Sequence, residues 1–166
     1  MSGHEHDIVT WSETYVTGIK LIDDQHKKLV DLTNRLYHAC LKKEDATVFK
    51  ETMSSMVEYV RFHFDAELQL LERVNYPNIL KHKKQHEKMV KSILDAVKDY
   101  GDGKKFVPNA FVWTLKDWVF GHIARSDKLY AAYIEEQKKK GLLSDVLLDV
   151  WKLKLHLPKS CYWNCI

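Results

Sequence analysis

The sequence lacks the features of a secreted or membrane-embedded protein. No hydrophobic run reaches membrane-spanning length, and the start, Met-Ser-Gly-His-Glu-His-Asp, has neither the basic nor the apolar region of a secretory signal. There are only three cysteines, and Cys40 lies far along the chain from Cys161 and Cys165, so no disulfide framework is indicated. These absences predict a protein of the reducing cytoplasm with no membrane partner.

The chain also lacks a basic patch. Its 26 lysines and arginines are scattered among 23 acidic residues, and the net charge is only +3. A nucleic-acid partner is therefore not indicated. The 166 residues suit one globular domain. What the sequence has in abundance is histidine, with nine residues in all.

Apolar residues recur at helical spacing over four long stretches joined by short connections. The stretches run from about 23 to 40, 45 to 74, 79 to 100 and 108 to 140. Asp23 or Asp24 is the expected N-cap of the first. The pattern predicts an all-α protein, an up-down-up-down four-helix bundle over residues 21–140. Residues 1–20 are expected to form an N-terminal arm.

Residues 141–166 are expected to form a C-terminal extension. Residues 142–150 suggest a short amphipathic helix, whereas 151–157 alternate with period two and fit a strand, a pairing edge or further helix. Cys161 and Cys165 have only His156 close by in sequence, so a mobile or loosely docked tail is favoured over a zinc site.

Polar residues that can bind a metal occupy the inner stripe of every predicted helix. His63 and Glu67 are one helical turn apart, so their side chains leave the same face. One such pair fits a hydrogen-bonded buried histidine equally well. The whole set is His26, His63, Glu67, His82, His86, His122 and Asp127. Burying so many polar groups without partners would cost kilocalories each, so the set favours a metal centre over a satisfied polar core.

His122 and Asp127 do not share a face of an ideal helix. Five residues apart, they differ by about 140° around the axis. They converge only if the facing helices form a wide pocket or if the helix is locally irregular.

The donor types and their number indicate two metal ions. Two carboxylates suit bridging, and seven donors are too many for one ion. Two six-coordinate ions with one bridging oxygen would leave a single open position, which suits a small diatomic ligand. Calcium and magnesium prefer oxygen donors, and zinc prefers four ligands, so iron fits best.

The spacings His63-x3-Glu67, His82-x3-His86 and His122-x4-Asp127, together with His26, resemble those of the hemerythrin family, particularly the bacterial hemerythrins. The resemblance covers roughly residues 8–135 and does not reach residues 142–166. Supporting matches are Trp11, Asp24-Gln25-His26-Lys27, Tyr76-Pro77, Trp118-x3-His122-Ile123 and Asp127-Lys128-x-Tyr130.

The resemblance implies a non-haem centre of two iron ions joined by an oxo or hydroxo bridge. One iron would be held by His82, His86 and His122, and the other, with the open position, by His26 and His63. Glu67 and Asp127 would bridge them. The expected pocket walls are Phe64, Trp118, Val119 and Ile123. Trp118 fits core packing equally well.

The resemblance implies reversible binding of dioxygen by a carrier, store or sensor, with nitric oxide, peroxide or small anions as other ligands. No catalytic acid or base stands among the inward positions, which favours a binding protein over an enzyme. The alternative is a di-iron enzyme that reduces peroxide or nitric oxide. A third hypothesis, an interaction module that signals its metal state through the tail, is weakened because no signalling domain is visible.

Overall fold

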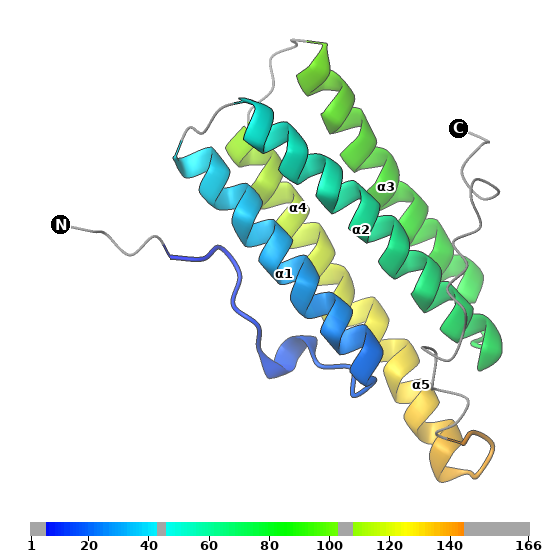
Figure 1. Ribbon diagram of the computed structural model, residues 1–166. Coiled ribbons are helices and arrows are strands. Elements are labelled where there is room, and N and C mark those ends of the chain that lie inside the picture. Colours follow the sequence, from blue (N-terminus) through cyan, green and yellow to red (C-terminus); the bar gives the residue numbers. More distant parts are fainter. Residues whose placement is uncertain (1–5, 43–45, 103–107, 145–166) are drawn as a thin grey trace.

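The computed structural model describes residues 6–42, 46–102 and 108–144, and within these ranges the protein is all-helical, without strands. Its main body is a bundle in which successive helices run in opposite directions (Figure 1). Helix α1 packs against α2 and α4, and α2 packs against α3. The bounds are η1 Glu13–Tyr15, α1 Lys20–Leu41, α2 Ala46–Arg73, α3 Ile79–Gly101, α4 Pro108–His122, η2 Ile123–Asp127 and α5 Lys128–Lys139. The predicted all-α up-down-up-down bundle is confirmed.

The inner stripes predicted from periodicity are the buried stripes of the structure. On α1, the positions from Ile22 to Leu36 that recur every three or four residues are all buried. Burial extends without interruption along one stripe of α2, from Phe49 to Leu70, and includes Val74 just after the helix. The turn from α2 to α3 is tight because Asn75 adopts a left-handed conformation with φ of 50°.

The fourth long helix is regular at its two ends and irregular in the middle. Residues Ile123–Asp127 form a turn of π-helix between α4 and α5. A π-helix closes hydrogen bonds between residues five apart, so residues with that spacing come close to one face. This is the local irregularity that the spacing of His122 and Asp127 requires.

The N-terminal arm lies across the bundle and is fixed at two points. The carboxylate of Asp23 accepts hydrogen bonds from the backbone N–H and hydroxyl of Thr17, both at 2.7 Å, and from the N–H of Gly18 at 3.1 Å. Gly18 has a φ of +79°, which a residue with a side chain rarely adopts. Further along, the amide of Asn34 pairs with both backbone groups of Val9.

This anchoring corrects the predicted start of the first helix. Helix α1 begins at Lys20, three residues before Asp23, and no side chain caps it. Asp23 is therefore inside the first turn, and its carboxylate binds the arm instead of capping the helix. Asp24 is exposed and pairs with Lys20 at 2.6 Å.

The apolar interior is divided into two clusters. The larger cluster lies toward the connection between α1 and α2, with Leu29 and Phe64 among its members. The smaller cluster lies toward the turn between α2 and α3 and includes Leu70, Tyr76 and Tyr130. On each long helix, the predicted metal donors stand in sequence between residues of the two clusters, so a polar layer separates them.

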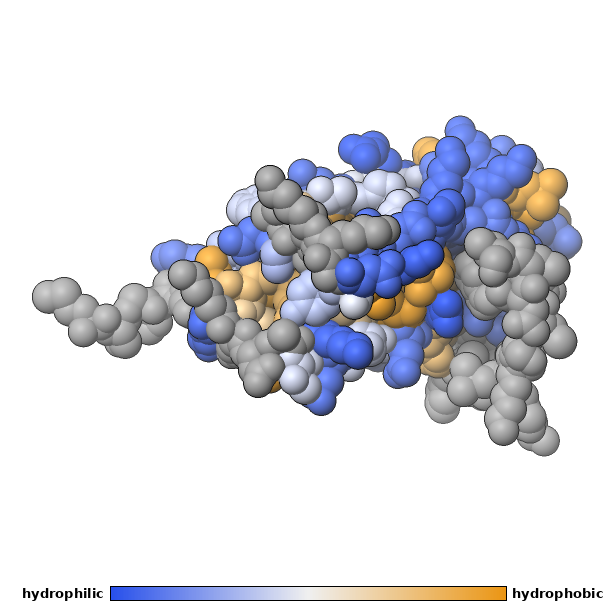
Figure 2. Space-filling view, turned by 90° about the horizontal axis from the view of Figure 1, so that it is seen from above, coloured by the Kyte–Doolittle hydropathy of each residue, from blue (hydrophilic) through white to orange (hydrophobic). Residues whose placement is uncertain are grey.

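None of the described helices is both long and apolar enough to span a bilayer. Seen from above, the surface is mostly hydrophilic, with apolar residues in separate areas (Figure 2). The predicted strand or helix at 151–157 and the pair Cys161 and Cys165 lie outside the described residues. Residues 141–144 follow α5, and Leu143 packs against the smaller cluster.

Candidate metal centre

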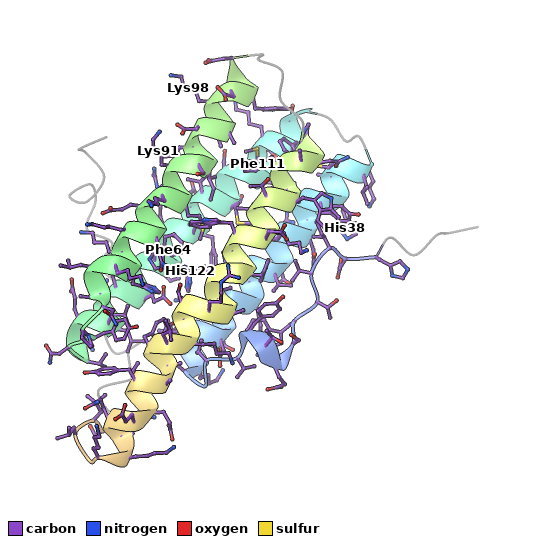
Figure 3. All side chains as sticks on the ribbon, turned by 180° about the vertical axis from the view of Figure 1, so that it is seen from behind. His38, Phe64, Lys91, Lys98, Phe111 and His122 are labelled. Atoms are coloured by element: carbon purple, nitrogen blue, oxygen red, sulfur yellow. The ribbon has the colours of Figure 1, made fainter. Side chains whose placement is uncertain are left out.

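The polar layer brings together all seven predicted donors, and none is more than 8% exposed. They fall into two groups of potential ligand atoms, within 4.8 Å of one another in each group. The first group is Glu67, His82, His86, His122 and Asp127; the second is His26, His63 and Glu67. Figure 3 shows His122 inside the bundle, whereas Lys91 and Lys98 project from the outer side of α3.

The first group has the spacing of ligands around one six-coordinate ion. Neighbouring ligands of such an ion, with bonds of about 2.1 Å, lie about 3 Å apart. Oε2 of Glu67 is 3.1 Å from Nε2 of both His82 and His86. Nε2 of His122 is 3.0 Å from Nε2 of His86 and 3.1 Å from Oδ1 of Asp127. The five donor atoms therefore lie close enough together to share one ion.

The second group is smaller and is oriented by a residue beside it. Nδ1 of His63 lies 2.9 Å from Oε1 of Gln25, which can only accept a hydrogen bond. His63 must therefore carry its proton on Nδ1, so Nε2 presents a lone pair to the site. The ring of His26 lies edge-on to that of His63, with centroids 4.8 Å apart.

Several buried polar atoms at the centre have no hydrogen-bond partner among the described residues. They are both ring nitrogens of His26, both carboxylate oxygens of Asp127 and Nδ1 of His86. An unsatisfied buried polar atom is costly, and a carboxylate is more costly than an imidazole. A cation between these donors would remove the cost, so the residues present fit a metal centre.

The pKa values of four of the donors, His63, His86, Glu67 and Asp127, also suit metal binding. Burial lowers the pKa of His63 to about 3 and that of His86 to about 4, so both imidazoles are neutral at pH 7. Burial raises the pKa of Glu67, but the imidazoles of His82 and His86 outweigh it and hold this pKa well below its usual range. Burial and the charge of Glu67 raise the pKa of Asp127, whereas the imidazoles of His122 and His26 lower it. The lowering outweighs the raising, and the pKa falls to about 2. Neutral imidazoles and ionised carboxylates are the forms that bind metals.

Two residues outside the predicted set support it. Tyr130, fully buried, donates its hydroxyl hydrogen to Oε1 of Glu67 at 2.5 Å. Gln25 holds His63 as described above. Tyr130 follows Asp127 on the same stripe and Gln25 precedes His26, so both were visible as neighbours in sequence. Their contacts cross between helices, and periodicity along one helix cannot show such contacts.

Three of the four predicted wall residues, Phe64, Val119 and Ile123, belong to the larger hydrophobic cluster, and Trp118 packs against this cluster from a partly buried position. Phe64 stacks on the ring of His86, with centroids 3.6 Å apart and planes within 6°. Val119 and Ile123 are buried in the larger hydrophobic cluster. Trp118 is half-buried and lies nearly parallel to His122 at 6.1 Å, on the side of a surface cavity. Trp118 therefore covers His122 from outside.

The fold and the donor set define a metal-binding four-helix bundle, and comparison with known proteins identifies its family. The model of the hemerythrin HHE cation binding domain matches residues 17–134. That range is most of the chain, so the protein belongs to the hemerythrin family.

Relatives and solved structures agree with this assignment. The bacteriohemerythrin of Pseudomonas aeruginosa PAO1 is 33% identical over an alignment of 128 residues, which covers 74% of this chain and 78% of that protein. That of Methylococcus capsulatus is 28% identical over 74% of this chain and 94% of its own length. A hemerythrin-like protein of Naegleria gruberi is 32% identical over 72% of this chain and 88% of its own. The crystal structure of a wild-type hemerythrin has a TM-score of 0.71 at 27% identity, covering 75% of this chain and 96% of that one.

Proposed function

We propose that this protein binds dioxygen reversibly at a pair of iron ions in the polar layer, as a carrier, store or sensor. In this proposal the first iron is held by three histidines and the second by two, with two carboxylates joining them. The first set is His82, His86 and His122, the second is His26 and His63, and the joining residues are Glu67 and Asp127. Family membership, the bundle and the two donor groups support it.

The observation that carries the proposal is the position of Asp127 between the two groups. Its Oδ1 lies 3.1 Å from Nε2 of His122, in the first group. Its Oδ2 lies 3.4 Å from Nε2 of His26, in the second. Glu67 likewise belongs to both groups. Carboxylates placed in this way suit two ions rather than one.

The unequal histidine sets favour an open position on the side of His26 and His63. When bound, the iron pair supplies the electrons for reversible binding of dioxygen. Burial keeps the imidazoles of His63 and His86 neutral, and the chain excludes water. Phe64, Val119 and Ile123 are each at most 2% exposed and close the apolar side of the layer. Exclusion of water from the layer suppresses side reactions, which favours reversible binding of the gas.

The test is an optical cycle on the iron-loaded full chain. We expect the reduced protein to gain a visible absorption band on aeration, to lose it under vacuum and to regain it through repeated cycles. The iron content should be two per chain, measured by elemental analysis. One-way oxidation accompanied by consumption of peroxide or nitric oxide would contradict carriage and favour the alternative enzyme.

We also propose the cytoplasm as its location and a division into an arm, residues 1–20, a bundle, residues 21–140, and an extension, residues 141–166. All seven residues proposed to hold the two irons belong to the bundle, which supports this division.

A further inference from the structure

A second polar site lies on the outer side of the metal centre. It is a surface cavity of about 160 Å³ between α3 and the turn of π-helix. Its walls are Gln85, Lys88, Trp118, Gly121, His122, Arg125 and Ser126. Among these described lining residues none is acidic, while two are permanent cations, one is an amide and one is a hydroxyl. The composition is that of an anion site.

The two cations of this cavity are not used elsewhere in the described part of the chain. Within residues 6–42, 46–102 and 108–144, neither Lys88 nor Arg125 forms an ion pair, and both are exposed. By contrast, Lys91, one turn further along α3, pairs with Asp95 at 2.9 Å. Two cations without a direct ion-pair partner therefore remain available at one cavity to bind an anion.

Gly121 allows the arginine to occupy its place in the cavity. A Cβ at this position would lie only 2.7 Å from Nη2 of Arg125. The guanidinium can therefore pack flat against the helix at Gly121, where any side chain would displace it. Arg125 and Ser126 both belong to the turn of π-helix, which presents them beside His122.

His122 connects the cavity to the metal centre. Its Nε2 points into the donor cluster, 3.1 Å from Asp127. Nδ1 is thus the ring nitrogen available to the cavity, and it has no hydrogen-bond partner among the described residues. Histidines that bind metals commonly donate this second N–H to an anion or a carbonyl oxygen.

We propose that this cavity binds a small tetrahedral oxyanion, of the class of phosphate and sulfate. Arg125 and Lys88 supply the charge, and Gln85 and Ser126 supply neutral donors. The bound oxyanion accepts the second N–H of His122 and so contacts the outer side of the metal centre. This site is distinct from the dioxygen position, and it does not depend on dioxygen binding.

The test is isothermal titration calorimetry of the iron-loaded full chain at constant ionic strength in chloride. Sulfate is the first probe because it is a poor ligand for iron, and phosphate is the second. We expect saturable binding of one anion per chain. Arg125→Gln and Lys88→Gln should each weaken binding by about tenfold or more, the usual effect of losing a hydrogen bond to a charged group. Gly121→Ala should also weaken it, since the new Cβ displaces the guanidinium.

The matched control is Lys91→Gln, which removes a lysine from the same helix on its outer side (Figure 3). Its affinity for sulfate should equal that of the unaltered chain. No saturable binding of either anion would overturn the proposal. So would binding that Arg125→Gln leaves unchanged, because the anion would then be elsewhere, or a loss with Lys91→Gln equal to that with Lys88→Gln, which would indicate only net charge. Failure of the optical cycle would leave these outcomes unaffected.

Discussion

The hydroxyl of Tyr130 and the carboxylate of Glu67 form a buried hydrogen bond across the polar layer, 2.5 Å long, between α5 and α2. The bond occupies Oε1 of Glu67, while Oε2 faces His82 and His86 at 3.1 Å. Burial, followed by the charge of Glu67, raises the pKa of Tyr130 well above its ordinary value, so the tyrosine remains a neutral donor. Tyr130 is therefore a positioning residue for the carboxylate shared by the two donor groups.

Tyr130→Phe should weaken iron binding without unfolding the bundle. The ring is retained and only the hydroxyl is lost, so packing is preserved while Glu67 loses its orientation. Loss of such outer contacts typically reduces metal affinity by about 10- to 100-fold. Competition with a chelator measures the change. The control is Tyr133→Phe, whose hydroxyl donates to backbone oxygens of Val74 and Asn75, away from the centre. Equal iron affinity in Tyr130→Phe and the unaltered chain would contradict the positioning role.

Gln25→Met should affect one iron more than the other. The substitution removes the acceptor for Nδ1 of His63 and preserves side-chain length, so the histidine loses its fixed tautomer. We expect about 10- to 100-fold weaker binding of the iron at His26 and His63, seen as a first, easily removed iron in a stepwise chelator titration. Gln69→Met, on the same helix as His63 and lining a different cavity, is the control. Simultaneous loss of both irons would argue against a separate second group.

Glu67→Ala should lower the iron content by about one ion or more per chain, because a carboxylate common to both groups disappears. Elemental analysis of the purified protein gives the count. Glu72→Ala, an exposed glutamate of the same helix, should keep the full content. Retention of both irons by Glu67→Ala would reject the bridging assignment.

The metal-free protein should lose stability in mild acid. Burial lowers the pKa of His63 to about 3 and of His86 to about 4, below the ordinary histidine value of 6.5. The two histidines therefore bind protons in the unfolded chain but not in the folded chain. As a result, the free energy of unfolding falls as the pH drops below about 6.5. Each fully neutral histidine contributes a loss of about 2 kcal/mol between pH 6.5 and 5.

His82 acts in the opposite direction. The pKa of His82 is raised, since the bond to Glu67 outweighs burial, and this partly offsets the loss. Urea unfolding of the metal-free chain at several pH values measures the balance. His63→Gln should flatten the profile, because one of the two groups that refuse protons is removed. A stability that rises on acidification would show that the imidazoles are charged in the folded state.

Deleting residues 145–166 should leave the iron content and the optical spectrum unchanged. Every proposed donor lies between His26 and Asp127, and Leu143, which packs on the smaller cluster, is kept. The comparison is made by elemental analysis of the shortened and full chains. Loss of iron in the shortened chain would contradict the proposed division between bundle and extension.

Most of the site could be predicted from the sequence because helical periodicity places His26, His63 and His86 on inner stripes. The pairing of His122 with Asp127 could not be explained by an ideal helix. The π-turn over Ile123–Asp127 brings them to 3.1 Å, and periodicity does not reveal such a turn. The predicted start of α1 was wrong for another reason. Asp23 accepts hydrogen bonds from the N-terminal arm instead of capping the helix, and this contact depends on how the arm packs.

The division of the interior has a consequence for how the chain opens. Two dry cores at opposite ends of the bundle can each protect their own segments, while the layer between them holds unsatisfied polar atoms. Slow amide exchange should therefore be concentrated near both ends in the metal-free chain, with faster exchange around Glu67. Ions bound in the layer would connect the four helices there, so the two ends of the bundle would open together as one cooperative unit.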